Sequence, residues 1–123
     1  MIRTPRRVEK PWGHEEIWAE TTRYVGKTLV VRAGHRLSLQ HHVVKDETIR
    51  IASGTLGLTM EDAQGVLLEL TLGPGQAVRI PPGRRHRMLA ITDVEIIEVS
   101  TLNWMTSSVM RTTTAAYERG PSP

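Results

Sequence analysis

Hydrophobic and polar residues alternate with a period of two in eight short runs between residues 26 and 100. Successive side chains of a β-strand point to opposite faces, so this alternation predicts strands that each bury one face. The predicted strands are GKTLVVR (26–32), RLSLQHH (36–42), ETIRIAS (47–53), TLGLTME (55–61), GVLLELTL (65–72), QAVRIP (76–81), HRMLAIT (86–92) and VEIIEVS (94–100).

Glycine and proline pairs separate these runs, as in Ser53-Gly54, Gly73-Pro74-Gly75 and Pro81-Pro82-Gly83. Short, evenly spaced strands without a long helical pattern predict a β-sandwich or a small barrel. We expect one domain over residues 1–123. It divides into an N-terminal arm (1–24), a barrel (25–102) and a C-terminal arm (103–123), and 105–117 could form a short helix.

Composition is that of one ordinary globular domain, with 123 residues, 39% hydrophobic and 24% charged. The chain has no Phe, so aliphatic side chains must fill the core. It has no Cys, which excludes disulfides and thiolate metal ligands and favours a reducing compartment. No secretory signal is evident, and no apolar run reaches the roughly 18 residues of a membrane span. We therefore expect a soluble, cytoplasmic protein.

Basic residues outnumber acidic ones, giving a formal net charge of +3, and 13 of the 16 are arginines. Nucleic-acid binding favours clustered basic residues interleaved with aromatics. Here the basic residues are scattered, apart from Arg84, Arg85 and Arg87, and aromatics make up only 4%. Because arginine binds carboxylates and phosphates in a planar, bidentate manner, small anionic ligands fit better.

Candidate metal ligands fall on three of the predicted strands. If Gln40 faces the interior, alternation places His42 and Arg36 on the same face and Leu37 on the other. Glu47 is in phase with two isoleucines of the next strand, which predicts an interior position.

A fourth candidate, His86, follows a rigid Pro-Gly turn and is in phase with Met88 and Ala90. One amide oxygen, two imidazoles and one carboxylate suit a divalent first-row metal ion such as Zn, Mn, Fe, Co or Ni. We predict that this ion is bound by Gln40, His42, Glu47 and His86.

These residues resemble the two motifs of the cupin superfamily. The first motif, G-x5-H-x-H-x4-E-x6-G, is matched by Gly34, Gln40 in place of its first His, His42, Glu47 and Gly54. The second, G-x5-7-P-x-G-x2-H-x3-N, is matched by Gly75, Pro81, Gly83 and His86, with Ala90 at the Asn position. The resemblance implies an all-β, single-domain cupin fold, a jelly-roll-like antiparallel β-barrel.

Among cupins, the chain looks most like the isomerase domain of type II mannose-6-phosphate isomerases. KPWGHEEIW (10–18), KTLVVRAG (27–34) and RLSLQHH (36–42) are similar to that family's PWG entry, K-R-I-x-V-K-P-G strand and R-L-S-L-Q-x-H segment. The family's Gln binds the metal, which implies this role for Gln40. Where the family has Q-x-H-H-H-R-x-E-H-W, this chain has QHHVVKDETI and lacks two histidines and the Trp.

Two basic residues are candidate catalytic groups. Lys27 shares a face with Leu29 and Val31, and the resemblance also places a Lys there. Lys27 and Arg36 could bind a phosphate or carboxylate, or polarise a carbonyl as an enediolate forms. Alternatively, both lie at strand ends and extend to water.

Three functions remain open from the sequence. The first is a metal-dependent isomerase or epimerase of sugars or sugar phosphates, similar to mannose-6-phosphate isomerase, although no inward base other than a ligand is evident. The second is a non-catalytic cupin that binds a metal or a sugar-like ligand. The third is an Fe-dependent dioxygenase, which Gln40 disfavours because that chemistry commonly uses three His and one Glu. In each case the resemblance implies a homodimer.

Overall fold

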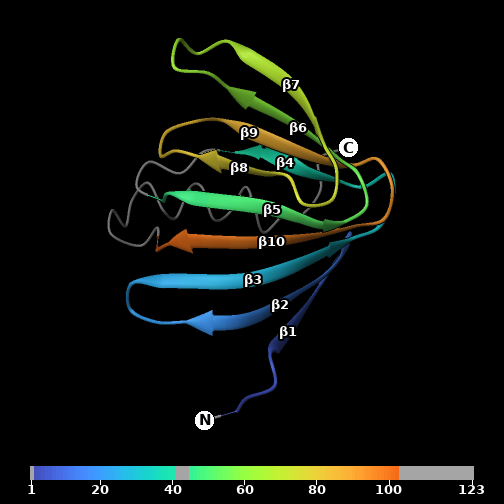
Figure 1. The fold of residues 1–123 in the computed structure, drawn as a ribbon, viewed down its shortest axis with the longest axis vertical. Helices are drawn as coiled ribbons and strands as arrows, with labels where there is room; N and C mark the ends of the chain where they lie inside the picture. The colour runs from blue at the N-terminus through green and yellow to red at the C-terminus, as the bar shows by residue number, and fades with distance from the viewer. Residues whose placement is uncertain (1, 41–44, 103–123) are drawn as a thin grey trace.

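Ten strands make up the fold of the described residues (Figure 1). The computed structural model describes residues 2–40 and 45–102, with only the backbone described for 38–40. The strands are β1 Arg6–Lys10, β2 Gly13–Glu20, β3 Tyr24–Val31, β4 Arg36–Gln40, β5 Glu47–Ser53, β6 Leu56–Glu61, β7 Leu67–Leu72, β8 Ala77–Ile80, β9 His86–Ala90 and β10 Val94–Thr101.

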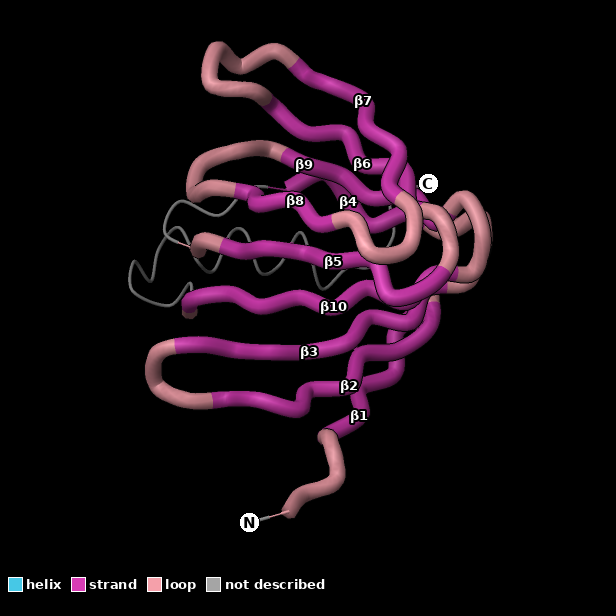
Figure 2. Tube along the Cα trace, in the orientation of Figure 1, coloured by secondary structure: helices cyan, strands magenta, loops and turns pink. Residues whose placement is uncertain are grey.

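Two antiparallel sheets contain these strands. The larger sheet has the order β1-β2-β3-β10-β5-β8, and the smaller sheet has the order β4-β9-β6-β7. Figure 2 shows the described chain as strands joined by loops and turns. All eight predicted strands are present, and the predicted all-β, jelly-roll-like fold is confirmed. Across the described ranges there is no helix long and apolar enough to cross a membrane.

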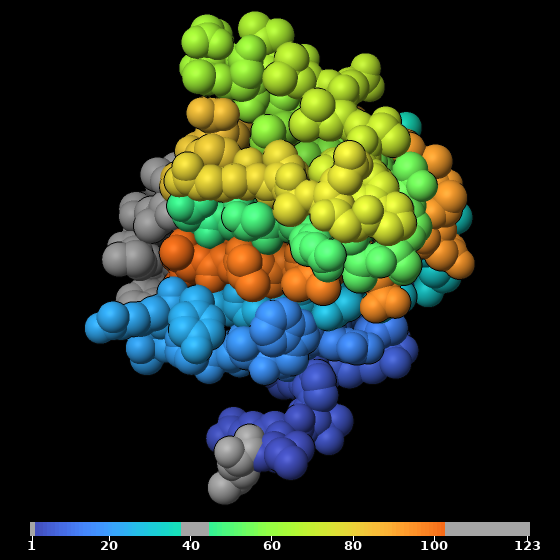
Figure 3. Space-filling model, in the orientation of Figure 1, coloured from blue at the N-terminus to red at the C-terminus, as the bar shows by residue number. Residues whose placement is uncertain are grey.

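The core lies between the two sheets, where the inward positions of both alternate with outward ones. Leu29, Ile49, Ile51 and Ile96 of the larger sheet are all fully buried and pack with inward residues of the smaller sheet, including Leu58. Aliphatic side chains thus fill the core, as the absence of Phe requires. Figure 3 shows β3, β10, β5 and β8 forming a continuous outer surface of the larger sheet.

The chain that precedes β3 belongs to the larger sheet, although the sequence predicts it as an arm. β2 pairs antiparallel with β3, and β1 pairs with β2. Trp12 is buried in the core, and Gly13 follows it with φ of 150°. A Cβ at Gly13 would lie 1.9 Å from the carbonyl oxygen of Val30, so only glycine permits this close pairing.

We predict that Ile96→Ala lowers the free energy of unfolding by about 2–5 kcal/mol, because it leaves a cavity in a fully buried position of β10. Val99→Ala is the matched control, since Val99 lies on the same strand and is 47% exposed. Chemical denaturation of both variants measures the difference. Equal losses of stability would contradict the assignment of the inward face.

Candidate functional site

One end of the space between the sheets is polar. Along β10 the inward residues change from Val94 and Ile96 to Glu98 and Ser100, all of them buried. Lys27 of β3 lies opposite Glu98, and Ser100 lies opposite Glu47 of β5. The inward face of the larger sheet therefore has an apolar end and a polar end.

Lys45 lies between two buried carboxylates at this polar end. Its Nζ is 3.4 Å from Oε2 of Glu47 and 3.2 Å from Oε2 of Glu98. A second buried ion pair joins Nζ of Lys27 to Oε2 of Glu15 on β2, at 3.4 Å. Three carboxylates and two ammonium groups thus share the polar end, where ions are stable only if they are paired.

The two carboxylates around Lys45 differ in acidity. Burial, followed by repulsion from Glu98, raises the pKa of Glu47 to about 7, although Lys45 acts in the opposite direction. Burial also acts to raise the pKa of Glu98, but attraction to Lys45 and Lys27 outweighs it and lowers that pKa to about 2. The pair titrates as a unit, so it holds a single proton over most of the range between these values.

His86 of β9 is the described imidazole of the smaller sheet that faces this polar end. It is 1% exposed, and its positive form contributes to the lowered pKa of Glu98. Its Nδ1 lies 3.2 Å from the carbonyl oxygen of Arg84. A carbonyl can only accept, so Nδ1 carries a proton, and in the neutral imidazole Nε2 then presents a lone pair. Metal-binding histidines have this arrangement.

A β-bulge in β4 determines the register of the predicted ligand Gln40. Leu37 lies opposite Met88 and Gln40 lies opposite His86, so three steps along β4 match two along β9. Gln40 is therefore at a register position opposite a second predicted ligand. The side chain of Gln40 and all of His42 lie outside the described residues. Within those residues, no three His, Asp or Glu side chains form a group that could hold a metal ion.

The two predicted catalytic residues lie in different places. Lys27 is inside, as predicted, and its side chain is 13% exposed. Arg36 is exposed on the outer face of the smaller sheet, and Leu37 is buried in its place. The prediction that Arg36 faces the interior is wrong, because its register position before the bulge, opposite Leu89, is on the outer face.

Sequence reasoning missed three charged groups of the polar end, namely Glu15, Lys45 and Glu98. For Glu98 the signal was present, since Val94 and Ile96 of the same alternating run face the core. Glu15 belongs to a segment that was predicted to be an arm. Lys45 lies between two predicted strands, and only the tertiary structure places its ammonium group between the carboxylates.

Glu47 and His86, the predicted ligands whose side chains the structure describes, are of donor types that bind divalent first-row metal ions. When Glu47 is ionised, the three carboxylates exceed the two ammonium groups by one negative charge. Oε2 of Glu98 is buried and accepts no hydrogen bond from the described residues, so its contact with Lys45 is an ion pair. Together with an imidazole and a carboxylate of the predicted ligand set, this excess favours binding of a cation.

Comparison with known sequences supports one family. The family model described as Mannose-6-phosphate isomerase C-terminal matches residues 1–111. The alginate biosynthesis protein AlgA of Pseudomonas aeruginosa is 30% identical over 94% of this chain and 24% of its own length. A mannose-1-phosphate guanylyltransferase of Sinorhizobium fredii is 33% identical over 64% of this chain and 14% of its own length. The chain thus spans about a quarter or less of these relatives.

Comparison with solved structures supports the fold. Oxalate decarboxylase from Bacillus subtilis at pH 4.6 superposes with a TM-score of 0.73 at 15% identity, covering 85% of this chain and 29% of its own. A structure of the same enzyme described for its Mn(II) centres gives 0.72 at 15% identity with the same coverage. KdgF from Halomonas sp. gives 0.67 at 19% identity, covering 75% of this chain and 82% of its own.

We predict that the metal-free protein loses stability as pH rises from about 4.5 to about 7. In this range folded Glu47 keeps a proton that the unfolded chain has released, so unfolding becomes more favourable as pH rises. Below about 4.5, stability falls as pH falls towards 2, because Glu98 stays ionised only in the folded state.

Glu47→Gln should abolish the loss between pH 4.5 and 7, as measured by denaturant unfolding at several pH values. Glu95→Gln removes an exposed carboxylate from β10 and is the control. A stability profile that is unchanged in Glu47→Gln would show that the proton is not held at Glu47.

Proposed function

Because the chain belongs to the mannose-6-phosphate isomerase C-terminal family, we propose that it is a metal-dependent isomerase or epimerase of sugars or sugar phosphates. The observation that carries the proposal is the polar end of the interior, where Glu47 and His86 face a second buried carboxylate, Glu98. Isomerisation requires a cation near the substrate oxygens and a group that moves a proton between neighbouring carbons. The polar end can supply both.

Gln40, His42, Glu47 and His86 would hold the metal ion. When bound, the ion would supply positive charge that stabilises an enediolate. The protonated Nδ1 of His86 is held by the Arg84 carbonyl, which orients the imidazole for binding through Nε2. The excess carboxylate of the interior offsets part of the charge of the ion.

Glu98 would move the proton between neighbouring carbons of the substrate. It is buried and is not part of the predicted ligand set. Its ion pair with Lys45, which lowers its pKa, would have to break when the cation and substrate bind, and Glu98 would then be a stronger base. Lys27 lies opposite Glu98 on the neighbouring strand and would bind a substrate oxygen or phosphate at the polar end. Because the site is buried between two sheets, bulk water would not compete for the proton.

A second candidate is a non-catalytic cupin that binds a metal or a sugar-like ligand. Lys45 favours it, because its ammonium group already neutralises Glu47 and would have to move or be outweighed when a cation binds. Binding without turnover of any bound sugar would support this candidate.

We predict that the purified protein contains a single metal ion per chain and that His42→Ala loses it, whereas His41→Ala keeps it. The physical reason is that adjacent strand residues face opposite sides, so only one of the two can contribute to an interior site. Mass spectrometry of the metal content measures this. If all five candidate metals fail to bind after reloading, the metal-dependent mechanism is wrong.

We predict that Glu98→Gln lowers kcat by about 100-fold or more while the metal content is unchanged, because the amide cannot accept the proton. The assay follows deuterium uptake from heavy water at the carbon next to the carbonyl, across hexose and pentose phosphates. Glu95→Gln is the matched control on the same strand. Absence of exchange in the metal-loaded parent protein for every substrate would contradict isomerase activity and leave the binding protein.

A further inference from the structure

A groove of ≈ 260 Å³ lies on the outer face of the smaller sheet, on the opposite side from the polar end. One row of outward positions crosses it from strand to strand. Arg36 of β4 lies opposite Leu89 of β9, Leu89 opposite Gly57 of β6, and Gly57 opposite Thr71 of β7. The groove is therefore built on paired strands, which hold its lining in place.

Gly57 lies at the centre of this row, and because it has no side chain it leaves a hollow there. It is paired on both sides in regular register, and it is not among the glycines with positive φ. A Cβ at this position would make ordinary contacts, the nearest at 3.5 Å to Cδ1 of Ile91. Neither the backbone nor the packing requires glycine, although glycine weakens a strand interior. Such a glycine often marks the close approach of a ligand.

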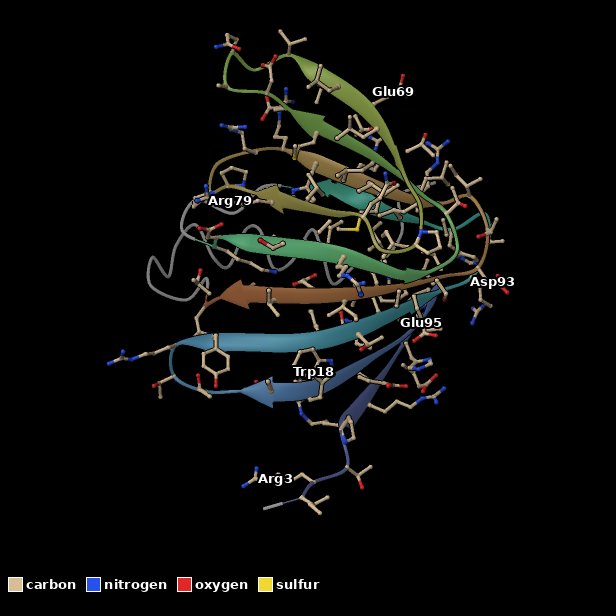
Figure 4. All side chains as sticks on the ribbon, in the orientation of Figure 1. Arg3, Trp18, Glu69, Arg79, Asp93 and Glu95 are labelled. Atoms are coloured by element: carbon tan, nitrogen blue, oxygen red, sulfur yellow. The ribbon has the colours of Figure 1, made fainter. Side chains whose placement is uncertain are left out.

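A second row of outward positions brings charge and hydroxyl groups to the same groove. Arg87 of β9 lies opposite Thr59 of β6, which lies opposite Glu69 of β7. Figure 4 shows Glu69 on β7 at the rim of the smaller sheet. Nε of Arg87 is buried and donates no hydrogen bond to any described residue. A buried N–H group without an acceptor is costly, so this donor calls for an acceptor from a ligand.

We propose that this groove is a second binding site, for a small organic anion that carries a carboxylate or phosphate group together with hydroxyl groups. The guanidinium groups of Arg36 and Arg87 bind the anionic group, and a turn of the Arg87 side chain towards the groove gives its Nε an acceptor. The threonine hydroxyls and Glu69 bind the hydroxyl groups of the ligand. Leu89 and Ile91, the latter 49% exposed, contact its carbon atoms.

The size and position of the groove define this site further. Its volume lies just below the usual range for small-molecule pockets, which suits a ligand no larger than a monosaccharide derivative. The smaller sheet separates it from the polar end, because Arg87 and His86 are adjacent on β9 and face opposite sides. The site is therefore independent of the proposed isomerase activity.

The test is an NMR titration of the full chain, labelled with ¹⁵N, in which amide shifts around the outer groove are followed separately from those at the polar end. Inorganic phosphate, succinate and glucose 6-phosphate are titrated separately, and the first two distinguish phosphate from carboxylate recognition. We expect saturable amide shifts centred on Gly57, Thr59, Thr71 and Arg87 with at least one probe. Arg87→Met should weaken binding about tenfold or more, because a charge-assisted hydrogen bond is lost.

Two further variants make the result decisive. Gly57→Val fills the hollow with a side chain that strands favour, and should also weaken binding about tenfold or more while the rest of the spectrum is unchanged. It also keeps the proposal testable if Arg87→Met fails to fold. Arg23→Met is the control, because it removes the same charge from an exposed turn residue outside the groove.

Three results would overturn the proposal. The first is the absence of saturable shifts on β6, β7 and β9 with all three probes. The second is unchanged affinity in both Arg87→Met and Gly57→Val. The third is shifts on the outer face that follow protein concentration without any anion, which would show that a second copy of the chain covers the groove.

Discussion

The burial of charge between two β-sheets is the constraint on which the polar end of this protein depends. Glu15, Glu47 and Glu98 lose water there, and each is stable only because Lys27 or Lys45 is close to it. These groups come from β2, β3, β10, β5 and the residues just before β5. The ion pair of Lys27 with Glu15 joins β3 to β2, and the ion pair of Lys45 with Glu98 joins the segment before β5 to β10, so the cluster ties the strands of the larger sheet to one another.

The apolar residues that stabilise the fold and the polar residues of the proposed site lie at opposite ends of the space between the sheets. At one end the inward residues of β10 and its neighbours are aliphatic and fully buried, and they supply the hydrophobic stabilisation. At the other end the same strands, together with β9 and the segment before β5, carry the carboxylates, the ammonium groups and an imidazole. Lys45 links the two requirements, because it stabilises the folded protein without a cation and also competes with a cation for Glu47.

Strand β9 contributes side chains to both faces of the smaller sheet. His86 points to the interior and is held by the Arg84 carbonyl, whereas Arg87 contributes to the outer groove. Because neighbouring residues of a strand face opposite sides, one rigid element can position groups for two separate sites. The proposed isomerase site and the proposed anion groove therefore share a scaffold without sharing a side chain.

The sequence by itself determined the eight strands from residue 24 onward and the burial of Glu47 and His86, because alternation within a strand is a local property that the chain encodes directly. β1 and β2 could not be predicted, since their charged residues become strand residues only by pairing with β3.

Tertiary structure alone decided the bulge in β4, the outward position of Arg36 and the position of Lys45 between Glu47 and Glu98. A bulge depends on the register between two strands, and an ion pair depends on strands that are distant in sequence. Alternation along one strand contains neither kind of information.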